Sequence, residues 1–232
     1  AATVTKALSD SNPYMRLAGV RGAEPFLAKG DGAMQAAALK LSDDANAGVR
    51  RQLAASLGEL PADTRVDQVV GLLRKFGDDT MVVDAGISGL KGQEADALIA
   101  LLSRPGASAD AAEMLAGAAA KSREVSQIDK VIALATDSAR PSALRVAMLD
   151  GAATGIAGVN ARRFGNNVAG GRAGGGIATV ARPHAAVKPV ALPAKPAKLI
   201  AVAEGGGDLA AAAKPVVDDL TWPGKPVPPA PK

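Results

Sequence analysis

The chain has 232 residues, of which 48% are apolar but only 2% aromatic, and its net charge is +4. It contains no cysteine, which excludes disulfides, thiolate metal sites and covalent haem attachment within these residues. No apolar run reaches the roughly 18 residues that indicate a membrane-spanning helix. Because alanine, valine and leucine supply most of the apolar content, and alanine and leucine favour helices, the composition predicts an all-α protein.

Charge is distributed unevenly along the chain. Residues 151–232 hold 10 Lys and Arg against 4 Asp and Glu, a net of +6, which leaves 17 and 19, a net of −2, for residues 1–150. The basic residues of the C-terminal part stand singly among Pro, Gly and Ala. Sites that bind nucleic acid cluster their basic residues and interleave aromatic ones. We therefore expect solvating charge on a linker and no nucleic-acid partner.

The first two thirds of the chain repeats one short pattern. In each copy a cluster of Asp, Ser and Asn is followed by an apolar residue, an Arg, and a stretch rich in Ala and Leu. The Met15-Arg16 and Val49-Arg50 pairs lie 34 residues apart, and Arg145 opens a later copy. The polar cluster can cap the helix that follows it. We expect Arg16, Arg50 and Arg145 to occupy equivalent positions at the starts of their helices.

Each repeated helix has a predicted partner, so that the copies form helix pairs. Leucine-rich stretches at helical spacing place the partner helices at 33–41, 65–76, 93–102 and 124–135, and a more divergent copy begins near Ser108. One pair cannot bury its own apolar stripe, so neighbouring pairs are expected to stack and share it. Gly58, Gly89 and Gly117 are expected where a helix ends or where two helices cross closely.

This pattern resembles the HEAT-repeat family, whose units carry an aspartate turn, then Val-Arg, then an alanine-rich stretch that ends in Leu-Gly. Residues 46–58 are the best match, and the resemblance covers about residues 5–157. It implies an α-solenoid, a right-handed stack of antiparallel helix pairs, over residues 1–158. The resemblance indicates a fold and leaves the function open, since this family serves many purposes.

The composition changes after Gly158. Residues 159–195 are rich in Gly and Pro and are expected to form an extended linker. Residues 196–203 and 208–220 can form two short helices, and the Trp-Pro-Gly-Lys-Pro motif that follows predicts a terminal strap. Fixing a proline-rich segment costs conformational entropy, so its sparse apolar residues, which include Leu220 and Trp222, are expected to anchor it on a partner or on the solenoid.

Few residues suggest catalytic or metal chemistry. His184 is the single histidine and lies beside a proline in an expected loop, without partners at the spacing of a metal site. The glycine-rich residues 170–176 lack the Lys-Ser/Thr of a phosphate-binding loop. The acidic doublets at 43–44 and 78–79 lack the spacing of a calcium loop, and helix capping explains them better. We expect no catalytic residue, no metal site and no cofactor, and hence no enzyme.

The C-terminal segment, residues 192–232, resembles the join that precedes the c-type cytochrome domain in exported dehydrogenases of the planctomycete type. That join has two short helices, then Leu-x-Trp-Pro-Gly-Lys-Pro and a proline-rich stretch, as do residues 196–232. The resemblance implies a periplasmic or otherwise exported protein, a module or subunit of a redox assembly, with a c-type cytochrome or dehydrogenase domain as partner. The expected partner-binding residues are Leu220, Trp222, Pro223, Lys225, Arg162 and Arg163.

Three functional hypotheses follow. The first is a non-catalytic scaffold within an exported redox or electron-transfer assembly. The second is a general protein-binding HEAT-repeat adaptor, which could be cytoplasmic. The third is an enzyme related to the bilin lyases, some of which also use HEAT-like repeats. The chain begins without Met, and we expect it to be a mature or excised piece of a longer product.

Overall fold

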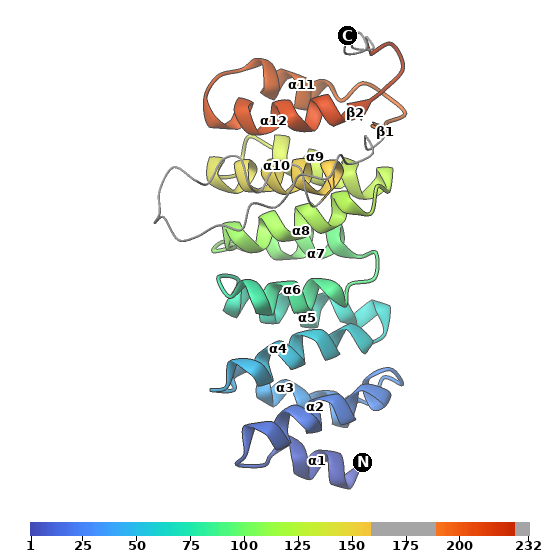
Figure 1. Cartoon of the computed structure of the whole chain (residues 1–232), viewed down its shortest axis with the longest axis vertical. Helices are drawn as coiled ribbons and strands as arrows, with labels where there is room; N and C mark the ends of the chain where they lie inside the picture. The colour runs from blue at the N-terminus through green and yellow to red at the C-terminus, as the bar shows by residue number, and fades with distance from the viewer. Residues whose placement is uncertain (159–188, 226–232) are drawn as a thin grey trace, which may run out of the picture.

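The structure is a computed structural model that describes residues 1–158 and 189–225. These residues are almost entirely helical, and their helices stack in two layers along one axis, with the N-terminus at one end and α11 and α12 at the other (Figure 1). Successive helices of the first layer pack against one another; they are α2 (Pro13–Leu27), α4 (Ala47–Ser56), α6 (Thr80–Ser88), α8 (Ala109–Lys121), α10 (Ser142–Ala157) and α12 (Gly207–Asp219). The second layer holds α1 (Ala2–Leu8), α3 (Gly32–Leu39), α5 (Ala62–Phe76), α7 (Glu94–Leu102), α9 (Val125–Thr136) and α11 (Ala197–Glu204).

The predicted all-α class is therefore confirmed, and the predicted partner helices coincide with α3, α5, α7 and α9 to within a few residues. Two short 3-10 helices, η1 (Lys40–Asp43) and η2 (Leu57–Glu59), extend α3 and α4. Within the described ranges, no helix is both long enough and apolar enough to cross a membrane.

Polar side chains cap α2, α4, α6 and α8, as the repeated clusters predicted, whereas α10 and α12 begin without a side-chain cap. The side-chain oxygen of Asn12 accepts the Tyr14 N–H at 2.9 Å, and that of Asn46 accepts the Gly48 N–H at 2.8 Å. Asp79 caps α6 and Ser108 caps α8 in the same way. These bonds satisfy amide groups that a helix leaves unpaired in its first turn.

The doublet at 43–44 does not cap a helix, and that expectation was wrong. Asp44 accepts the backbone N–H of Asn46 at 2.8 Å and so shapes the turn, while Asn46 itself caps α4. Asp43 forms an ion pair with Lys75. The doublet lies one turn before the helix start, which leaves its carboxylates free to reach the helix pairs on either side.

Small residues bring first-layer helices unusually close together. A Cβ added to Gly58 would lie 2.4 Å from the Cα of Gly89, and a Cβ added to Gly151 would lie 2.1 Å from the carbonyl oxygen of Glu113. Both distances are far below van der Waals contact, so only glycine fits. The expectation of close helix crossings at Gly58 and Gly89 is confirmed, and α8 and α10 meet through alanines and glycines in the same manner.

The C-terminal segment folds as part of the stack. Helices α11 and α12 pack against each other, and α12 covers α10. Two short strands, β1 (Val190–Ala191) and β2 (Leu220–Thr221), pair in parallel beside them. The two short helices expected at 196–203 and 208–220 correspond to α11 and α12, so this segment is not an extended strap along its length. Its apolar side chains are instead buried in the chain's own core, because the last repeat would otherwise leave the apolar face of α10 exposed to water.

Candidate partner-binding site

The Trp-Pro-Gly-Lys motif closes a local turn. The Lys225 N–H donates to the Trp222 carbonyl at 3.1 Å, and Gly224 has a φ of 83°. Proline in the second position, glycine with positive φ in the third, and a bond from the fourth residue to the first define a type II β-turn. The motif therefore has a structural reason within this chain.

The Lys225 side chain ends α12. Its ammonium donates to the carbonyl of Val217 at 2.6 Å and to that of Asp218 at 3.1 Å, and also to the carbonyl of Leu220. It lies 4.7 Å from the centre of the Trp222 ring. A cation at this place satisfies carbonyls that have no partner within the helix and complements the negative end of its dipole.

The six expected partner-binding residues consequently have different positions. Leu220 is fully buried in this chain's own core, so its assignment to a partner surface was wrong. Lys225 is engaged by α12, whereas Trp222 is half-buried and Pro223 is exposed. Arg162 and Arg163 lie outside the described residues, as does His184.

Replacing Lys225 with methionine is expected to lower the free energy of unfolding of the C-terminal helices by about 1–2 kcal/mol, because three carbonyls lose their charged donor. Trp222 is the only tryptophan, so its fluorescence during urea unfolding reports on this part of the chain. Lys214→Met removes an exposed lysine of the same helix and is the matched control. Equal midpoints for the two variants would show that the Lys225 bonds contribute little.

Arginines at the helix starts make equivalent contacts in the first two repeats. One guanidinium nitrogen of Arg16 donates to the carbonyls of Asp10 and Ser11, each at 2.9 Å. The same nitrogen of Arg50 donates to the carbonyls six and five residues before it, at 2.7 Å and 3.3 Å. Arg145 instead donates to the carbonyl of Ala135, because the turn before α10 is longer. The predicted equivalence holds for Arg16 and Arg50, and Arg145 departs from it.

Arg16 also joins the first repeat to the second. Its Nε donates to one carboxylate oxygen of Asp44 at 2.6 Å, and its second terminal nitrogen donates to the other oxygen at 2.8 Å. The side-chain exposure of Asp44 is only 4%. The hydrogen bond from Arg16 holds the pKa of Asp44 below its ordinary value, although partial burial opposes this effect.

This ion pair predicts a pH dependence of stability. A carboxyl group with a depressed pKa in the folded state contributes stability that is fully present above its unfolded pKa of about 3.9, and that is lost as the pH falls through the lower folded value. Asp44→Asn should remove that contribution and flatten the dependence below about pH 4. Urea unfolding of both proteins at a series of acidic pH values measures this dependence. If the free energy of unfolding of the two proteins varies with pH in the same way, the stabilising role of Asp44 is contradicted.

Further polar contacts connect successive repeats at similar separations in sequence. The Glu24 carboxylate accepts the hydroxyl of Ser56, which is 32 residues away, at 2.7 Å. The buried amide of Gln127 accepts the Ala95 N–H at 2.9 Å and donates to the Gly92 carbonyl at 2.6 Å. The sequence pattern does not identify Gln127, since nothing in it distinguishes a buried glutamine from an exposed one.

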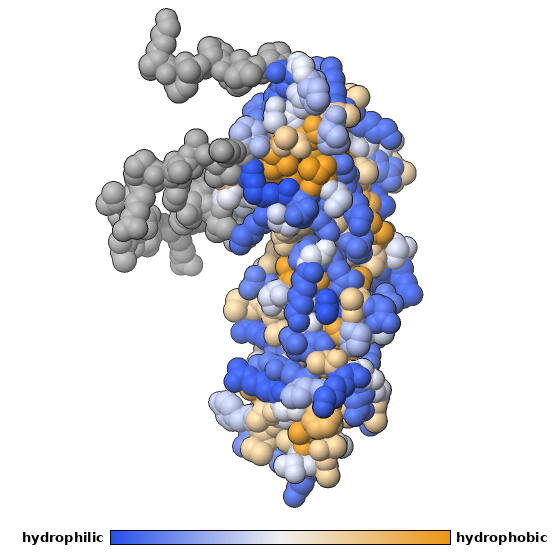
Figure 2. Space-filling model, turned by 90° about the vertical axis from the view of Figure 1, so that its right-hand side faces the viewer, coloured by the Kyte–Doolittle hydropathy of each residue, from blue (hydrophilic) through white to orange (hydrophobic). Residues whose placement is uncertain are grey.

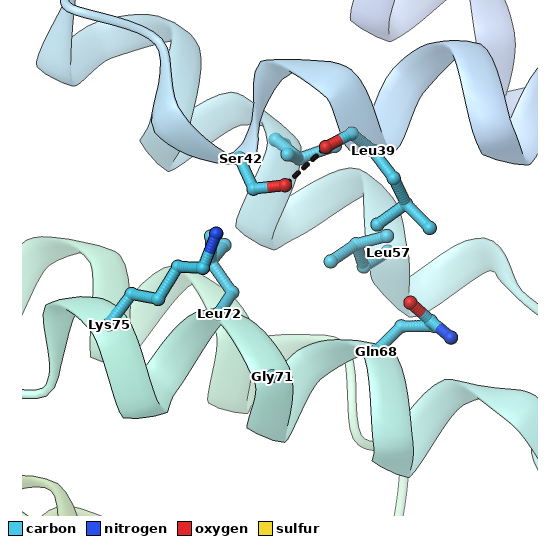
Figure 3. A pocket seen from close by; sticks show the side chains of 8 residues that line it. Leu39, Ser42, Leu57, Gln68, Gly71, Leu72 and Lys75 are labelled. Atoms are coloured by element: carbon cyan, nitrogen blue, oxygen red, sulfur yellow. Dashed lines mark hydrogen bonds between the residues drawn. The ribbon is translucent and has the colours of Figure 1, made fainter.

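One pocket interrupts the second layer. Consecutive helices of this layer pack directly at α1–α3, α5–α7, α7–α9 and α9–α11, but α3 and α5 make little contact. A cavity of about 220 Å³ lies between them (Figure 3). Leucines of both layers form its wall, and Ser42, Gln68 and Lys75 lie at its edge; the leucines are Leu39, Leu53, Leu57 and Leu72.

The face seen in Figure 2 is mainly hydrophilic, with an apolar area at the height of α9 and α10. Among the residues that the structure describes, no three His, Cys, Asp or Glu side chains are grouped so that they could hold a metal ion. No known protein family, curated protein or solved structure matches this chain.

Proposed function

We propose that this chain is a HEAT-like α-solenoid that serves as a non-catalytic scaffold for protein partners. The observation that carries the proposal is the recurrence of one set of contacts from repeat to repeat. Arg16 and Arg50 make the same backbone bonds, and cross-repeat bonds such as Glu24–Ser56 join groups about one repeat apart. An array in which each unit packs mainly on its neighbours presents an elongated surface, which suits the holding of partners.

The more specific part of the proposal is that the scaffold is a module or subunit of an exported redox or electron-transfer assembly. It rests on the resemblance of residues 196–232 to the segment before a c-type cytochrome domain. Hydrogen bonds within the Trp222–Lys225 turn explain that motif structurally. The proposal therefore rests on the resemblance and not on an exposed binding motif.

Purification of the native protein with its bound partners tests this assignment. We expect haem or quinone absorbance to co-elute with the chain. This absorbance should be lost when the chain is captured by a tag and washed under dissociating conditions. A defined protein partner without either chromophore would favour a general adaptor. A bilin bound to the chain would favour the enzyme and would overturn the proposal of a non-catalytic scaffold.

A further inference from the structure

The pocket between α3 and α5 combines an apolar wall with two polar side chains at fixed separation. The lining leucines Leu53, Leu57 and Leu72 are buried. Gln68 and Lys75 lie along α5 on either side of Gly71 (Figure 3). A cavity of about 220 Å³ exceeds the roughly 150 Å³ that accommodates benzene in an engineered core. It can therefore hold a branched aliphatic side chain.

Gly71 adds no side chain to this pocket, and its place in a helix has an energetic cost. A Cβ added there would meet no atom within 4 Å, and its backbone is helical. Alanine would fit and would favour the helix by about 1 kcal/mol. The close helix crossing that explains Gly58 and Gly151 does not apply at Gly71.

The polar groups at the edge of the pocket can take new partners. Lys75 forms an ion pair with Asp43 at 2.7 Å, but the two side chains are 48% and 71% exposed. Such a pair contributes little stability, so another carboxylate can replace Asp43 at small cost. The half-buried amide of Gln68 carries a donor and an acceptor, as does a peptide backbone, and no hydrogen bond to it is found within the described residues.

The spacing of these groups matches an extended peptide. Gly71 and Lys75 are four residues apart on a helix, so their Cα atoms are about 6 Å apart along its axis, and the flexible Lys75 side chain carries its ammonium within reach of this spacing. Alternate side chains of an extended chain point the same way and are about 6.6 Å apart. A segment that places an aliphatic side chain over Gly71 would thus place the side chain two residues later beside Lys75.

We propose that this pocket binds an extended segment of a partner protein that carries an aliphatic residue, any residue, and then an acidic residue. The aliphatic side chain enters the leucine pocket, the acidic side chain pairs with Lys75, and the Gln68 amide bonds to the segment's backbone. The inference deepens the proposed scaffold function, on which it rests, by naming the chemistry of a partner.

The test is a titration of the full chain, with labelled leucine methyl groups, against the acetylated and amidated peptide Gly-Leu-Ser-Glu-Gly. We expect shifts confined to the pocket leucines and a dissociation constant on the order of 1 mM. The peptide with Ala for Leu should bind at least tenfold more weakly, since it buries less apolar surface. The peptide with Gln for Glu should bind about threefold more weakly, as expected for an exposed ion pair.

Variants of the chain separate binding from packing. Gly71→Leu should fill the pocket and abolish the shifts while it maintains or raises the thermal stability. Lys75→Gln should remove the preference for the Glu peptide over the Gln peptide, and Lys91→Gln, which removes a comparable lysine paired with Glu59, should preserve it. Unchanged binding to Gly71→Leu, or no shift of the pocket leucines at about 10 mM peptide, would overturn the inference. Either result would leave the scaffold function intact if native partners still co-purify.

Discussion

Replacing Gly151 with alanine is expected to destabilise the protein by about 3 kcal/mol or more, at the upper end of the usual cost of overpacking. The added Cβ would lie 2.1 Å from the Glu113 carbonyl oxygen and 3.1 Å from the Gly117 nitrogen, so it meets backbone atoms. Backbone atoms cannot rotate away as a flexible side chain does, and α8 and α10 must separate along their contact. The midpoint of urea unfolding, followed by far-UV circular dichroism, measures this change.

Gly71→Ala is the matched control for that experiment. It makes the same chemical change within a helix, but the new methyl group enters open space. We expect it to stabilise the protein by roughly 0.5–1 kcal/mol, because alanine loses less backbone entropy than glycine when the helix forms. If both substitutions shift the midpoint in the same direction, the close approach of α8 and α10 is not what determines the effect at Gly151.

Leu220→Ala is expected to cost about 2–5 kcal/mol in the stability of the C-terminal helices, as for other buried leucines. Leu220 is fully buried, and it pairs with Val190 in the short parallel sheet beside α12. The loss should be local, since α12 packs mainly on α10, α11 and β2 and lies at one end of the helix stack. The Trp222 fluorescence transition should therefore move to lower urea than the circular dichroism transition, which reports on all the helices.

Pro223→Ala provides the comparison at an exposed residue of the same turn. Its cost should be below about 1 kcal/mol and should come mainly from the greater freedom of the unfolded chain. If the Leu220→Ala protein unfolds like the wild type but loses affinity for its native partner, Leu220 lies on a partner surface. That outcome would contradict the core position described above.

Local features of the sequence were sufficient to predict several helix starts and the positions of the partner helices α3, α5, α7 and α9. Asn12 and Asn46 follow polar clusters at a constant spacing, and they cap α2 and α4 because a capping bond spans only two or three residues. The Arg16 and Arg50 equivalence was predictable for the same reason, since these side chains bond to carbonyls a few residues away. Apolar periodicity located α5 and α9 correctly, because strongly amphipathic helices reveal their buried face in sequence.

The C-terminal segment shows where composition misleads. The two short helices of this segment were predicted, but Leu220 was assigned to a partner surface and lies instead in the core. The apolar face of α10 offers a surface on which this segment can fold, and the burial that results offsets its conformational entropy. No rule applied to residues 196–225 alone includes that surface.

The sequence by itself determined the helical class and the capped starts of α2, α4, α6 and α8, since both depend on residues within one or two turns. Only the tertiary structure decided that α3 and α5 separate enough to leave a pocket beside Gly71, and that Lys225 serves the carbonyls of α12. Both depend on how neighbouring segments are positioned in three dimensions. A glycine over open space and a glycine in a close crossing look identical in sequence, because the difference lies in the atoms opposite them.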